Sequence, residues 1–426
     1  MEGRPHGRCH EGIVVTVPAH LPERLAITLW DFSWYTRAGV GEPYEDIDRA
    51  FIEAAERGYN TVRICAAPML LCGGLGVSPV VRIGGLGPAP QGDYYGRRTR
   101  WYDVPGGYEI DVRTRLLELF ASARRHGFVV ILASWEYQQS ASFAEHPDWW
   151  NAMDAIPLAD RLDRLAGAAS GVLSLLNEHG FADLVAFTEL HNEIDFSLVG
   201  ELDERAMASM QRVRDEHPGQ LVTASWGKPP HLDMAAIPSG IDAAQFHIYS
   251  YGVLDALQSL IDLRAHGSDG FPNAQLRGLL RDDAPSFTEY GTPAPWKLEA
   301  TVITDQMIYG YDWIDADRWD LWLYEHYALH AEAMRREIES RLAAVAAWSK
   351  RAGVPHVIGE GWIGYTPLDG TFEEGPVGRA LAEHGIRAAL ANDAWGMVLC
   401  SNAAPHHPMW ADVAWQQRMN TEILSA

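Results

Sequence analysis

Short apolar runs alternate with longer amphipathic segments along most of the chain. The apolar runs have the length of buried strands and are bounded by glycine, proline or polar residues. They predict eight strands, at residues 25–31, 60–65, 128–134, 182–190, 221–225, 243–249, 355–360 and 395–401.

The segments between these strands carry apolar residues at helical spacing, and several end at a glycine, which is a helix-stop signal. They predict helices at residues 46–57, 111–126, 157–179, 201–217, 321–350, 372–390 and 412–423, with a short helix near 231–236. Alternating strands and helices indicate a parallel sheet, and eight such units fit a closed barrel better than an open sheet. The predicted fold class is therefore α/β, a single (β/α)8 TIM barrel.

Two long segments interrupt this alternation, after the second and the sixth strand. Residues 66–110 are rich in Gly, Pro and Tyr, and residues 250–319 are rich in Asp, Trp and Tyr. Loops of this length in a compact domain are usually functional or mobile, so we expect insertions at the active site. No Lys-Ser/Thr pair follows the glycines, which argues against a phosphate-binding loop. We find no linker and expect one domain over 1–426, with 1–24 as an extension packed on the barrel.

The composition narrows the class of partner. The chain carries 57 acidic and 34 basic residues, a formal charge of -23, which argues against nucleic acid or an anionic membrane as partner. The polar N-terminus and its short apolar run do not form a signal peptide or a membrane span, so we expect a cytoplasmic protein. Four cysteines lack metal-ligand spacing and are expected to be reduced: Cys9, Cys65, Cys72 and Cys400.

Ionisable residues follow two of the predicted strands directly. The fourth strand continues into Asn192 and Glu193, and the seventh ends at Glu360. In barrels of parallel strands, chemistry takes place at the carboxyl ends of the strands. The plainer interpretation is that each strand simply leaves the core and turns polar. On the sixth strand His247 and Tyr249 are two residues apart and so share a face.

Aromatic residues point to the class of ligand. The chain has 16 Trp and 16 Tyr, and several Trp stand beside polar residues at presumed strand ends. Some belong to the core, as aromatic side chains usually do. The apolar faces of sugars stack on such rings, so this composition favours a carbohydrate ligand.

Taken in strand order, these residues resemble the clan A glycoside hydrolases, the (β/α)8 retaining glycosidases that include family 5 cellulases, and more narrowly bacterial cellulase-like proteins. The resemblance covers nearly the whole chain but rests on sparse motifs. It implies that Glu193 is the general acid/base and Glu360 the nucleophile. It also matches Arg63 to an arginine near the nucleophile, and His247-Ile-Tyr249 to a His-x-Tyr pattern on strand six.

Two departures from the family pattern bear on the substrate. The clan usually has a Trp at the end of strand eight that floors the catalytic subsite, whereas this strand continues through Ser401 and Asn402 with no Trp before Trp410. Either Trp410 reaches back, or the floor is built differently. The residue after the acid/base is often Pro, and here it is Ile194.

Retaining hydrolysis needs two carboxyl groups about 5–5.5 Å apart, and strands four and seven lie on opposite sides of an eight-stranded barrel. We expect Arg63 and Tyr249 to stabilise the charge of Glu360, and Asn192 to bond the sugar 2-hydroxyl. Arg63 as a structural ion-pair partner and His247 as a core histidine are the alternatives. Candidates for sugar contact by position, with packing as an equal alternative, are Asp31, Trp34, Trp135, Glu136, His191, Trp226 and Trp362; Glu189 and Asp195 are expected to shape the acid/base pKa or to bind sugar.

Other chemistries fit less well. His-Asn-Glu lacks the spacing of a His-Glu-x-x-His metal site, and adjacent histidines such as His406 and His407 seldom ligate one ion, so we expect neither metal nor cofactor. No Gly-x-Ser-x-Gly motif supports a serine hydrolase. The prediction is a retaining β-glycosidase acting on short oligosaccharides or glycosides, as a monomer or homodimer. The alternatives are a non-catalytic sugar-binding protein and, more weakly, a sugar lyase or isomerase. Sugar and linkage stay open.

Overall fold

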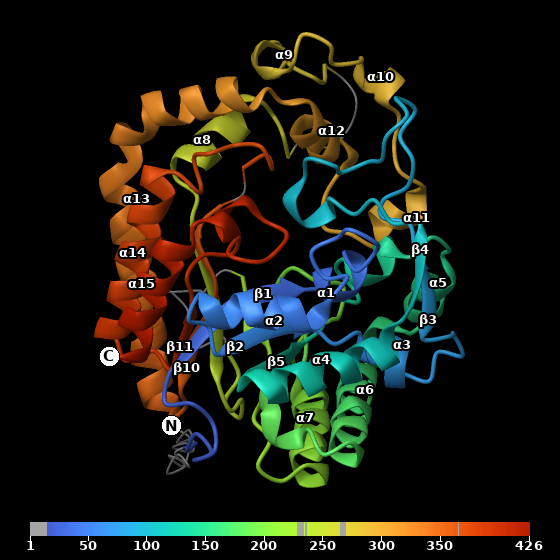
Figure 1. Ribbon diagram of the computed structural model, residues 1–426, viewed down its shortest axis with the longest axis vertical. Coiled ribbons are helices and arrows are strands. Elements are labelled where there is room, and N and C mark those ends of the chain that lie inside the picture. Colours follow the sequence, from blue (N-terminus) through green and yellow to red (C-terminus); the bar gives the residue numbers. More distant parts are fainter. Residues whose placement is uncertain (1–14, 228–233, 235–236, 265–269, 365) are drawn as a thin grey trace, which may run out of the picture.

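The computed structural model describes residues 15–227, 234, 237–264, 270–364 and 366–426 (Figure 1). The main sheet contains β1 (Leu25–Asp31), β2 (Thr61–Cys65), β5 (Val129–Ala133), β6 (Val185–Glu189), β7 (Val222–Thr223), β8 (Ser225–Trp226), β9 (Ala244–Ser250), β10 (His356–Ile363) and β11 (Gly396–Val398). Their order is β7-β6-β5-β2-β1-β11-β10-β9-β8, and all neighbours pair in parallel.

The sheet closes into a barrel with a single seam. Its two edge strands, β7 and β8, are separated in the chain only by Ala224, so both edges belong to one interrupted strand. We call the gap between these two edges the seam. With β7 and β8 counted together there are eight strand positions, which confirms the predicted (β/α)8 barrel.

Helices cover the outside of this barrel. They follow the strands as α2 (Ile47–Glu56), α4 (Val112–His126), α6 (Leu158–Glu178), α7 (Glu204–Glu216), α13 (Ala316–Ala352), α14 (Pro376–Ala391) and α15 (Val413–Leu424). Each matches a predicted helix, with its ends shifted by a few residues. The short helix expected near 231–236 falls mainly outside the described residues. Among the helices that the structure describes, none combines the length and apolarity that crossing a membrane requires.

Local sequence signals explain where these helices begin and end. Asp111 caps α4 by accepting hydrogen bonds from the N–H groups of Arg113 and Thr114. Gly127 ends the same helix at φ +73°, a left-handed conformation that favours glycine. Asp315 and Gly353 play the same two roles for α13, which is 37 residues long. The capping residues therefore define the first and last residues of these helices, which hydrophobic periodicity alone does not fix.

Three strands differ in extent from the prediction. The segment 182–184 is a 3-10 helix, η3 (Ala182–Leu184), so β6 begins only at Val185. β11 ends at Val398, and beyond it the Ser401 side chain hydrogen-bonds the backbone of Gly361 in β10. β10 continues to Ile363, since it pairs with β9 along its length.

Both long segments contain secondary structure of their own. In and after the first segment lie α3 (Pro68–Cys72), the antiparallel pair β3 (Val80–Ile83) and β4 (Tyr108–Asp111), and η1 (Arg100–Tyr102). The second contains α8 (Val253–Leu260), α9 (Ala274–Leu279), α10 (Phe287–Tyr290), α11 (Pro295–Glu299) and α12 (Asp305–Trp313). Smaller elements elsewhere are α1 (Ser33–Thr36), η2 (Ser140–Phe143), α5 (Asp148–Asp154) and η5 (Pro408–Ala411). These helices are mostly too short for a periodic pattern to reveal.

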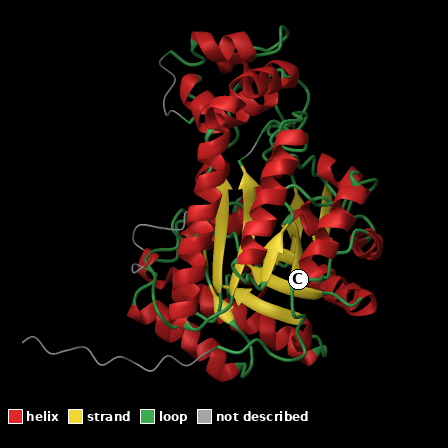
Figure 2. Cartoon of the chain, turned by 90° about the vertical axis from the view of Figure 1, so that its left-hand side faces the viewer, coloured by secondary structure: helices red, strands yellow, loops and turns green. Residues whose placement is uncertain are grey.

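The two insertions lie together over one end of the barrel. Figure 1 shows α9, α10 and α12 above the barrel, and the strand arrows of Figure 2 point toward that end. Asp312 joins the insertions: it accepts hydrogen bonds from the N–H groups of Gly96 (2.7 Å) and Arg98 (2.9 Å) and from the Tyr290 hydroxyl (2.6 Å). Burial raises the pKa of this carboxyl to about 6. The two insertions thus form one wall at the carboxyl ends of the strands.

Lys297 anchors that wall to the barrel loops. Its buried ammonium donates hydrogen bonds to the carbonyls of Gly85, Ser142 (2.8 Å) and Ala144 (2.7 Å). Burial lowers the pKa of Lys297 to about 7. Three buried carbonyls therefore depend on one side chain for a donor.

Replacing Lys297 with Met should lower the free energy of unfolding by about 1–3 kcal/mol, because the three carbonyls lose their donor without gaining water. The measurement is the urea midpoint followed by far-UV circular dichroism. Lys350, exposed near the end of α13, is the matched control, and Lys350→Met should change stability by less than about 0.5 kcal/mol. Equal midpoints for the two variants would contradict this role of Lys297.

Candidate active site

The barrel brings the two predicted catalytic glutamates to the carboxyl ends of opposite strands. Glu360 lies within β10, where the register places it beside His247 of β9. Glu193 lies in the loop that follows β6, at φ +46°. Its N–H donates to the Ser225 hydroxyl at 2.8 Å, and the next N–H, of Ile194, donates to the Ser225 carbonyl at 3.0 Å. Ser225, on the β8 edge of the seam, therefore fixes the position of Glu193.

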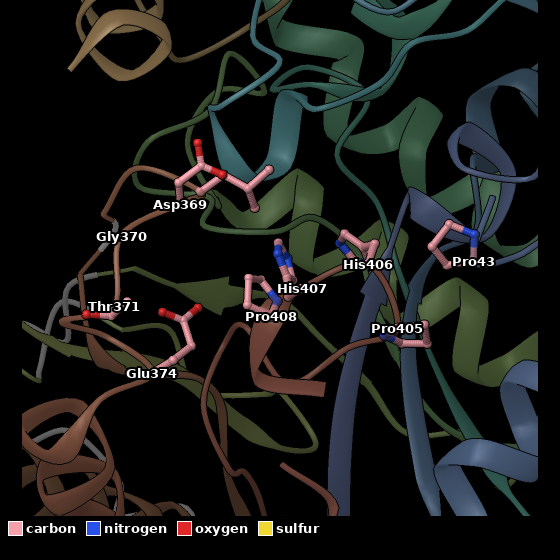
Figure 3. A pocket seen from close by; sticks show the side chains of 10 residues that line it. Pro43, Asp369, Gly370, Thr371, Glu374, Pro405, His406, His407 and Pro408 are labelled. Carbon is pink, nitrogen blue, oxygen red and sulfur yellow. The ribbon is translucent and has the colours of Figure 1, made fainter. Parts of the chain in front are cut away.

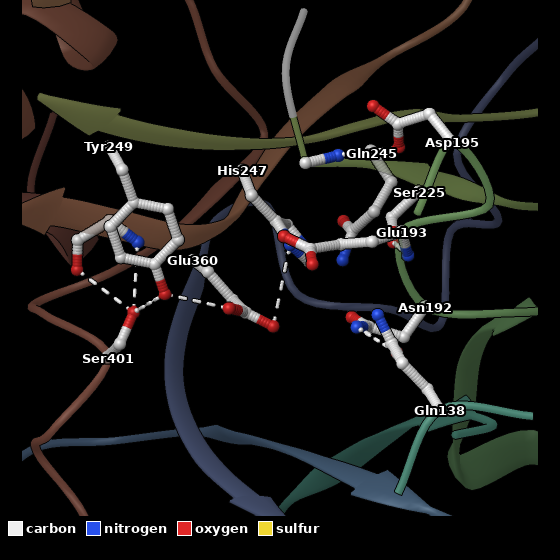
Figure 4. Close-up of polar contacts among 12 residues, drawn as sticks. Gln138, Asn192, Glu193, Asp195, Ser225, Gln245, His247, Tyr249, Glu360 and Ser401 are labelled. Atoms are coloured by element: carbon white, nitrogen blue, oxygen red, sulfur yellow. Dashed lines mark hydrogen bonds and ion pairs between the residues drawn. The ribbon is translucent and has the colours of Figure 1, made fainter. Parts of the chain in front are cut away.

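His247 lies between the two carboxylates (Figure 4). Its Nδ1 is 2.9 Å from Glu193 Oε1 and 3.5 Å from Glu360 Oε1. One oxygen of each glutamate and the histidine nitrogen all lie within 4.8 Å of one another. Two carboxyl groups this near each other are compatible with the short separation, about 5–5.5 Å, that retaining glycosidases use.

Glu360 is held as an anion by two direct donors. Arg63 donates to its Oε1 at 2.8 Å, and the Tyr249 hydroxyl donates to its Oε2 at 2.7 Å. Ser401 lies 2.6 Å from the same tyrosine oxygen and bonds the backbone of Gly361, which fixes the tyrosine. A carboxylate with this set of donors favours its ionised form.

Arg63 connects the nucleophile position to the inside of the barrel. Its Nε and Nη2 donate to the two oxygens of Glu189 at 2.8 and 2.7 Å, and Nη2 also donates to Asn192 Oδ1 at 2.6 Å. Its guanidinium stacks over the Trp135 ring, 4.5 Å from the centroid. The arginine side chain is fully buried. Arg63 is therefore both a structural ion-pair partner, through Glu189, and a neighbour of Glu360, the predicted nucleophile.

The two glutamates differ in the direction of their pKa shifts. Burial raises the pKa of Glu193, the bond from His247 opposes this shift, and the charge of Glu360 adds to it. Burial also raises the pKa of Glu360, but His247, Arg63 and Tyr249 outweigh it and leave the pKa below its ordinary value. The side chain of Glu193 is 20% exposed and that of Glu360 only 7%. Their environments thus shift the two pKa values in opposite directions, as the predicted roles of acid/base and nucleophile require.

The same three side chains, Glu193, His247 and Glu360, are spaced as metal ligands could be. Two features fit a metal poorly. The His247 Nδ1 is already engaged by Glu193, and the Arg63 cation contacts Glu360 at 2.8 Å, so a second cation there would be repelled. These three side chains therefore fit proton transfer better than metal binding.

Several other predicted residues gather around this centre. Asp31, at the end of β1, lies 3.8 Å from Arg63, and burial raises its pKa well above the ordinary value. Asn192 accepts from Arg63 and donates to Gln138 at 2.8 Å. The Trp135 ring contacts Arg63 rather than an open surface. Asp195 accepts from the Gly227 N–H at 3.0 Å, and its charge adds to the raised pKa of Glu193.

Three predicted tryptophans pack in the core instead. Trp34 donates to the Cys65 carbonyl at 2.9 Å and has no exposed surface. Trp226 packs against Phe246, with ring centroids 5.6 Å apart. Trp362 packs against α14 so closely that a Cβ at Gly385 would lie 2.3 Å from its ring. In this structure the packing interpretation describes all three.

Glu136 and His191 are also fully buried and bond the backbone rather than the catalytic pair. Glu136 accepts from the Met69 N–H at 3.0 Å, and burial raises its pKa to about 7. His191 bonds the Asn192 carbonyl through Nδ1 at 2.7 Å, and burial lowers its pKa to about 3. Both side chains therefore hold loop backbone in place near the site through these hydrogen bonds.

Trp410 does not reach back to the site. It stacks on Tyr59, bonds Glu53 and lies under Arg57, all on the outside of the barrel. Ser401 stands in the strand-eight region where the clan usually has a Trp. Of the two alternatives, this leaves a catalytic subsite whose floor is built differently. The sequence analysis did not single out Gln138, Ser225 or Gln245, whose Nε2 donates to Glu189 at 3.2 Å. For Gln245 a signal existed, because it shares the alternating face of His247 and Tyr249.

Removing Arg63 should destabilise the fold strongly, because Glu189 would remain as a buried charge. We expect Arg63→Met to lower the free energy of unfolding by about 3–5 kcal/mol, measured by urea unfolding. Adding Glu189→Gln should restore part of that loss. Arg336→Met, at an exposed pair with Glu332, is the control and should cost at most about 1 kcal/mol. A double variant no more stable than Arg63→Met would refute the pairing.

Comparison with solved structures supports the fold. A candidate glycoside hydrolase from Parabacteroides distasonis aligns with a TM-score of 0.63 at 19% identity, covering 95% of this chain and 94% of that one. A family 5 mannosidase from Rhizomucor miehei aligns with a TM-score of 0.48 at 12% identity, covering 95% and 94%. At 19% identity, the similarity to the Parabacteroides protein shows a shared fold and says nothing about activity. We draw no conclusion from the weaker similarity to the Rhizomucor enzyme.

Comparison with sequences identifies the family. No curated protein matches the chain. A family model described as "Sugar-binding cellulase-like" matches residues 27–146 and 276–424, which together make up more than half of the chain. These segments contain Arg63 and Glu360 and most of the barrel strands. The chain therefore belongs to the sugar-binding cellulase-like family.

Proposed function

We propose that this protein is a retaining β-glycosidase that uses Glu360 as nucleophile and Glu193 as acid/base. One observation carries the proposal: two carboxyl groups with oxygens within 4.8 Å of each other have pKa values displaced in opposite directions. Pairs of titratable groups driven apart in this way mark an acid and a base. Membership of a cellulase-like family supports the assignment to glycoside hydrolysis.

The reaction would proceed in two displacements. The Glu360 carboxylate attacks the anomeric carbon and forms a glycosyl ester while Glu193 gives its proton to the leaving oxygen. Glu193, now ionised, takes a proton from water, the water oxygen bonds the anomeric carbon, and Glu360 leaves as a carboxylate. The anomeric configuration is inverted twice and therefore retained.

The neighbours have assignable tasks in this scheme. Arg63 and Tyr249 keep Glu360 ionised before attack and accept it again as leaving group. Asn192 Nδ2 gives one hydrogen to Gln138 and has a second to offer to the sugar 2-hydroxyl. His247 holds the Glu193 carboxyl close to Glu360.

The insertions support a preference for short substrates. They are joined through Asp312 and Lys297 and stand over the carboxyl ends of the strands (Figure 2). A wall at that end would limit how many sugar units can extend past the reaction centre. We therefore infer action on glycosides or short oligosaccharides. Random internal cleavage of a long polysaccharide would contradict this inference.

A non-catalytic sugar-binding protein is the second candidate, favoured by the family description as sugar-binding. It would use the same site without turnover. A panel of aryl β- and α-glycosides separates the two candidates: cleavage of a β-glycoside supports the enzyme, and binding without cleavage that is unchanged in Glu360→Ala supports the binding protein.

Azide should distinguish the roles of the two glutamates. Glu193→Ala should still form the glycosyl ester from a dinitrophenyl β-glycoside, and azide should then release a β-glycosyl azide. Glu360→Gly leaves room for azide to attack directly, so the product should be the α-glycosyl azide. Each variant without azide should lose roughly two or more orders of magnitude in rate on ordinary aryl glycosides. The product configuration is measured by NMR, and β-azide from both variants would refute the assignment of Glu360.

The pH dependence of kcat/KM should be bell-shaped, because the reaction needs Glu360 ionised and Glu193 protonated. The acid limb should lie below the ordinary glutamate pKa of 4.5 and the alkaline limb above it. Tyr249→Phe removes a bond to the ionised form of Glu360, so its acid limb should move to higher pH. On substrates with activated leaving groups, Glu193→Gln should lose only the alkaline limb. An unshifted acid limb in Tyr249→Phe would contradict the role of that hydroxyl.

A further inference from the structure

A pocket of about 520 Å³ opens between the loops that follow β1, β10 and β11 (Figure 3). Its lining, as far as the structure describes it, includes none of the predicted catalytic or sugar-contact residues. Both oxygens of Glu374 accept from Arg100, and Asp369 pairs with Arg98 at 3.1 Å. The ring nitrogens of His407 are buried beneath the lining. Within the described lining, few polar side chains are thus left to bind a ligand.

The carboxyl of Glu193, by contrast, lies against a position that has no side chain. That position is Gly227, which directly follows β8 and is buried. A Cβ on Gly227 would lie 2.5 Å from Glu193 Oε1, 2.7 Å from Glu193 Cδ and 2.6 Å from Phe196 Cε2. Ordinary contact between carbon atoms needs about 3.5–4.0 Å. The Glu193 carboxyl therefore occupies space that a side chain at position 227 would fill.

Hydrogen bonds fix the backbone on both sides of this contact. The N–H of Glu193 donates to the Ser225 hydroxyl at 2.8 Å, and the N–H of Gly227 donates to Asp195 Oδ1 at 3.0 Å. Figure 4 shows Ser225 and Asp195 beside Glu193. The loop after β6 and the end of β8 are thus tied together twice. A clash at position 227 would therefore be relieved by side chains rather than by the backbone.

This contact acts on the position of the carboxyl more than on the fold. Glu193 Oε1 and Phe196 Cε2 are the far ends of rotatable side chains, so both can turn away from an added methyl group. Gly227 does not adopt a left-handed backbone conformation, so alanine introduces no backbone strain there. We therefore expect Gly227→Ala to fold with its Glu193 carboxyl displaced.

The atom that would be displaced is the one that bonds His247. Glu193 Oε1 lies 2.9 Å from His247 Nδ1, and the same nitrogen lies 3.5 Å from Glu360 Oε1. The place of Oε1 beside Gly227 thus determines both its bond to the histidine and its distance from the second glutamate. Misplacing a reacting group by about 1 Å can cost about 100-fold in rate.

We propose that Gly227 is a positioning residue for the proton donor: because it has no Cβ, it leaves open the space in which the Glu193 carboxyl bonds His247 and faces Glu360. The proposal rests on the proposed function, since it takes Glu193 as the acid/base. The position of the carboxyl can nevertheless be measured without any substrate. The proposal assigns a part in proton transfer to a residue that has no side chain of its own.

The kinetic test compares Gly227→Ala with wild type on the 2,4-dinitrophenyl and phenyl β-glycosides of the sugar that the aryl glycoside panel identifies. Dinitrophenolate leaves without a proton, whereas the phenyl leaving group needs one from Glu193. Gly227→Ala should therefore lower kcat/KM on the phenyl glycoside by about 10- to 100-fold and on the dinitrophenyl glycoside by less than about threefold. In a Glu193→Ala background it should have little further effect, because the displaced carboxyl is then absent.

Gly171→Ala is the matched control, because a Cβ there would lie 2.6 Å from Cys72 Cβ, in a similarly crowded place between α6 and α3. It should lower stability without changing the ratio of the rates on the two glycosides. Equal losses on both glycosides in Gly227→Ala, no loss on either, or the same further loss in the Glu193→Ala background would overturn the proposal.

Stability decides the question if Gly227→Ala is too unstable to assay. The urea midpoint of the double variant with Glu193→Ala should then recover most of the loss, because the crowding carboxyl is gone. A double variant as unstable as Gly227→Ala alone would overturn the proposal.

A measurement on the free protein separates the proposal from the proposed function. Burial lowers the pKa of His247, but the charge of Glu360 and the bond to Glu193 outweigh it and leave the pKa above its ordinary value. In Gly227→Ala the bond to Glu193 is lost, so this pKa should fall. It is followed by NMR titration of the imidazole, assigned with His247→Gln. If wild type cleaves nothing, the proposed function fails, yet a lower pKa of His247 still supports the role of Gly227 in placing the carboxyl; an unchanged pKa would overturn it.

Discussion

The buried guanidinium of Arg63 is the interaction on which the rest of the site depends. A charge inside a barrel is costly unless it is compensated, and here the compensation comes from Glu189, Glu360 and Asn192. These partners come from β6, β10 and the loop after β6, while Arg63 belongs to β2. One cation thus sets the relative positions of strands on opposite sides of the barrel. The same cation that is buried in the interior also lowers the pKa of Glu360, the proposed nucleophile.

The two predicted catalytic glutamates differ in pKa shift and exposure because their surroundings differ. Glu360 is enclosed by donors from two strands, β2 and β9, whereas Glu193 stands in a loop and is more exposed. His247 contacts both. Two residues of the same type therefore have pKa values shifted in opposite directions by their positions. The two insertions stand over the same end of the barrel and would control access to these glutamates. The proposed chemistry and the selection of substrate would thus depend on different parts of the chain.

Much of this arrangement could be predicted from the sequence. Strand and helix periodicity placed every barrel element to within a few residues, because both faces of such strands are buried. Glu193 and Glu360 were identifiable as polar residues just beyond apolar runs. The sequence could not show to which side a side chain at a strand end points. Trp34, Trp226 and Trp362 also stand at strand ends, but their rings pack in the core. The short helices of the insertions and the contacts of Ser401 and Gln245 depend on tertiary neighbours that no local pattern encodes.

The seam at Ala224 links the closure of the barrel to the position of Glu193. The N–H groups of Glu193 and Ile194 both donate to Ser225, so the loop that carries the proposed proton donor also bridges the gap between the sheet edges. Glu360 sits on a strand paired on both sides and has no such freedom. Any widening or narrowing of this gap would shift Glu193 while leaving Glu360 in place. If the proposed roles hold, mutations that rigidify the gap would raise barrel stability and reduce the range of leaving groups that the site accepts.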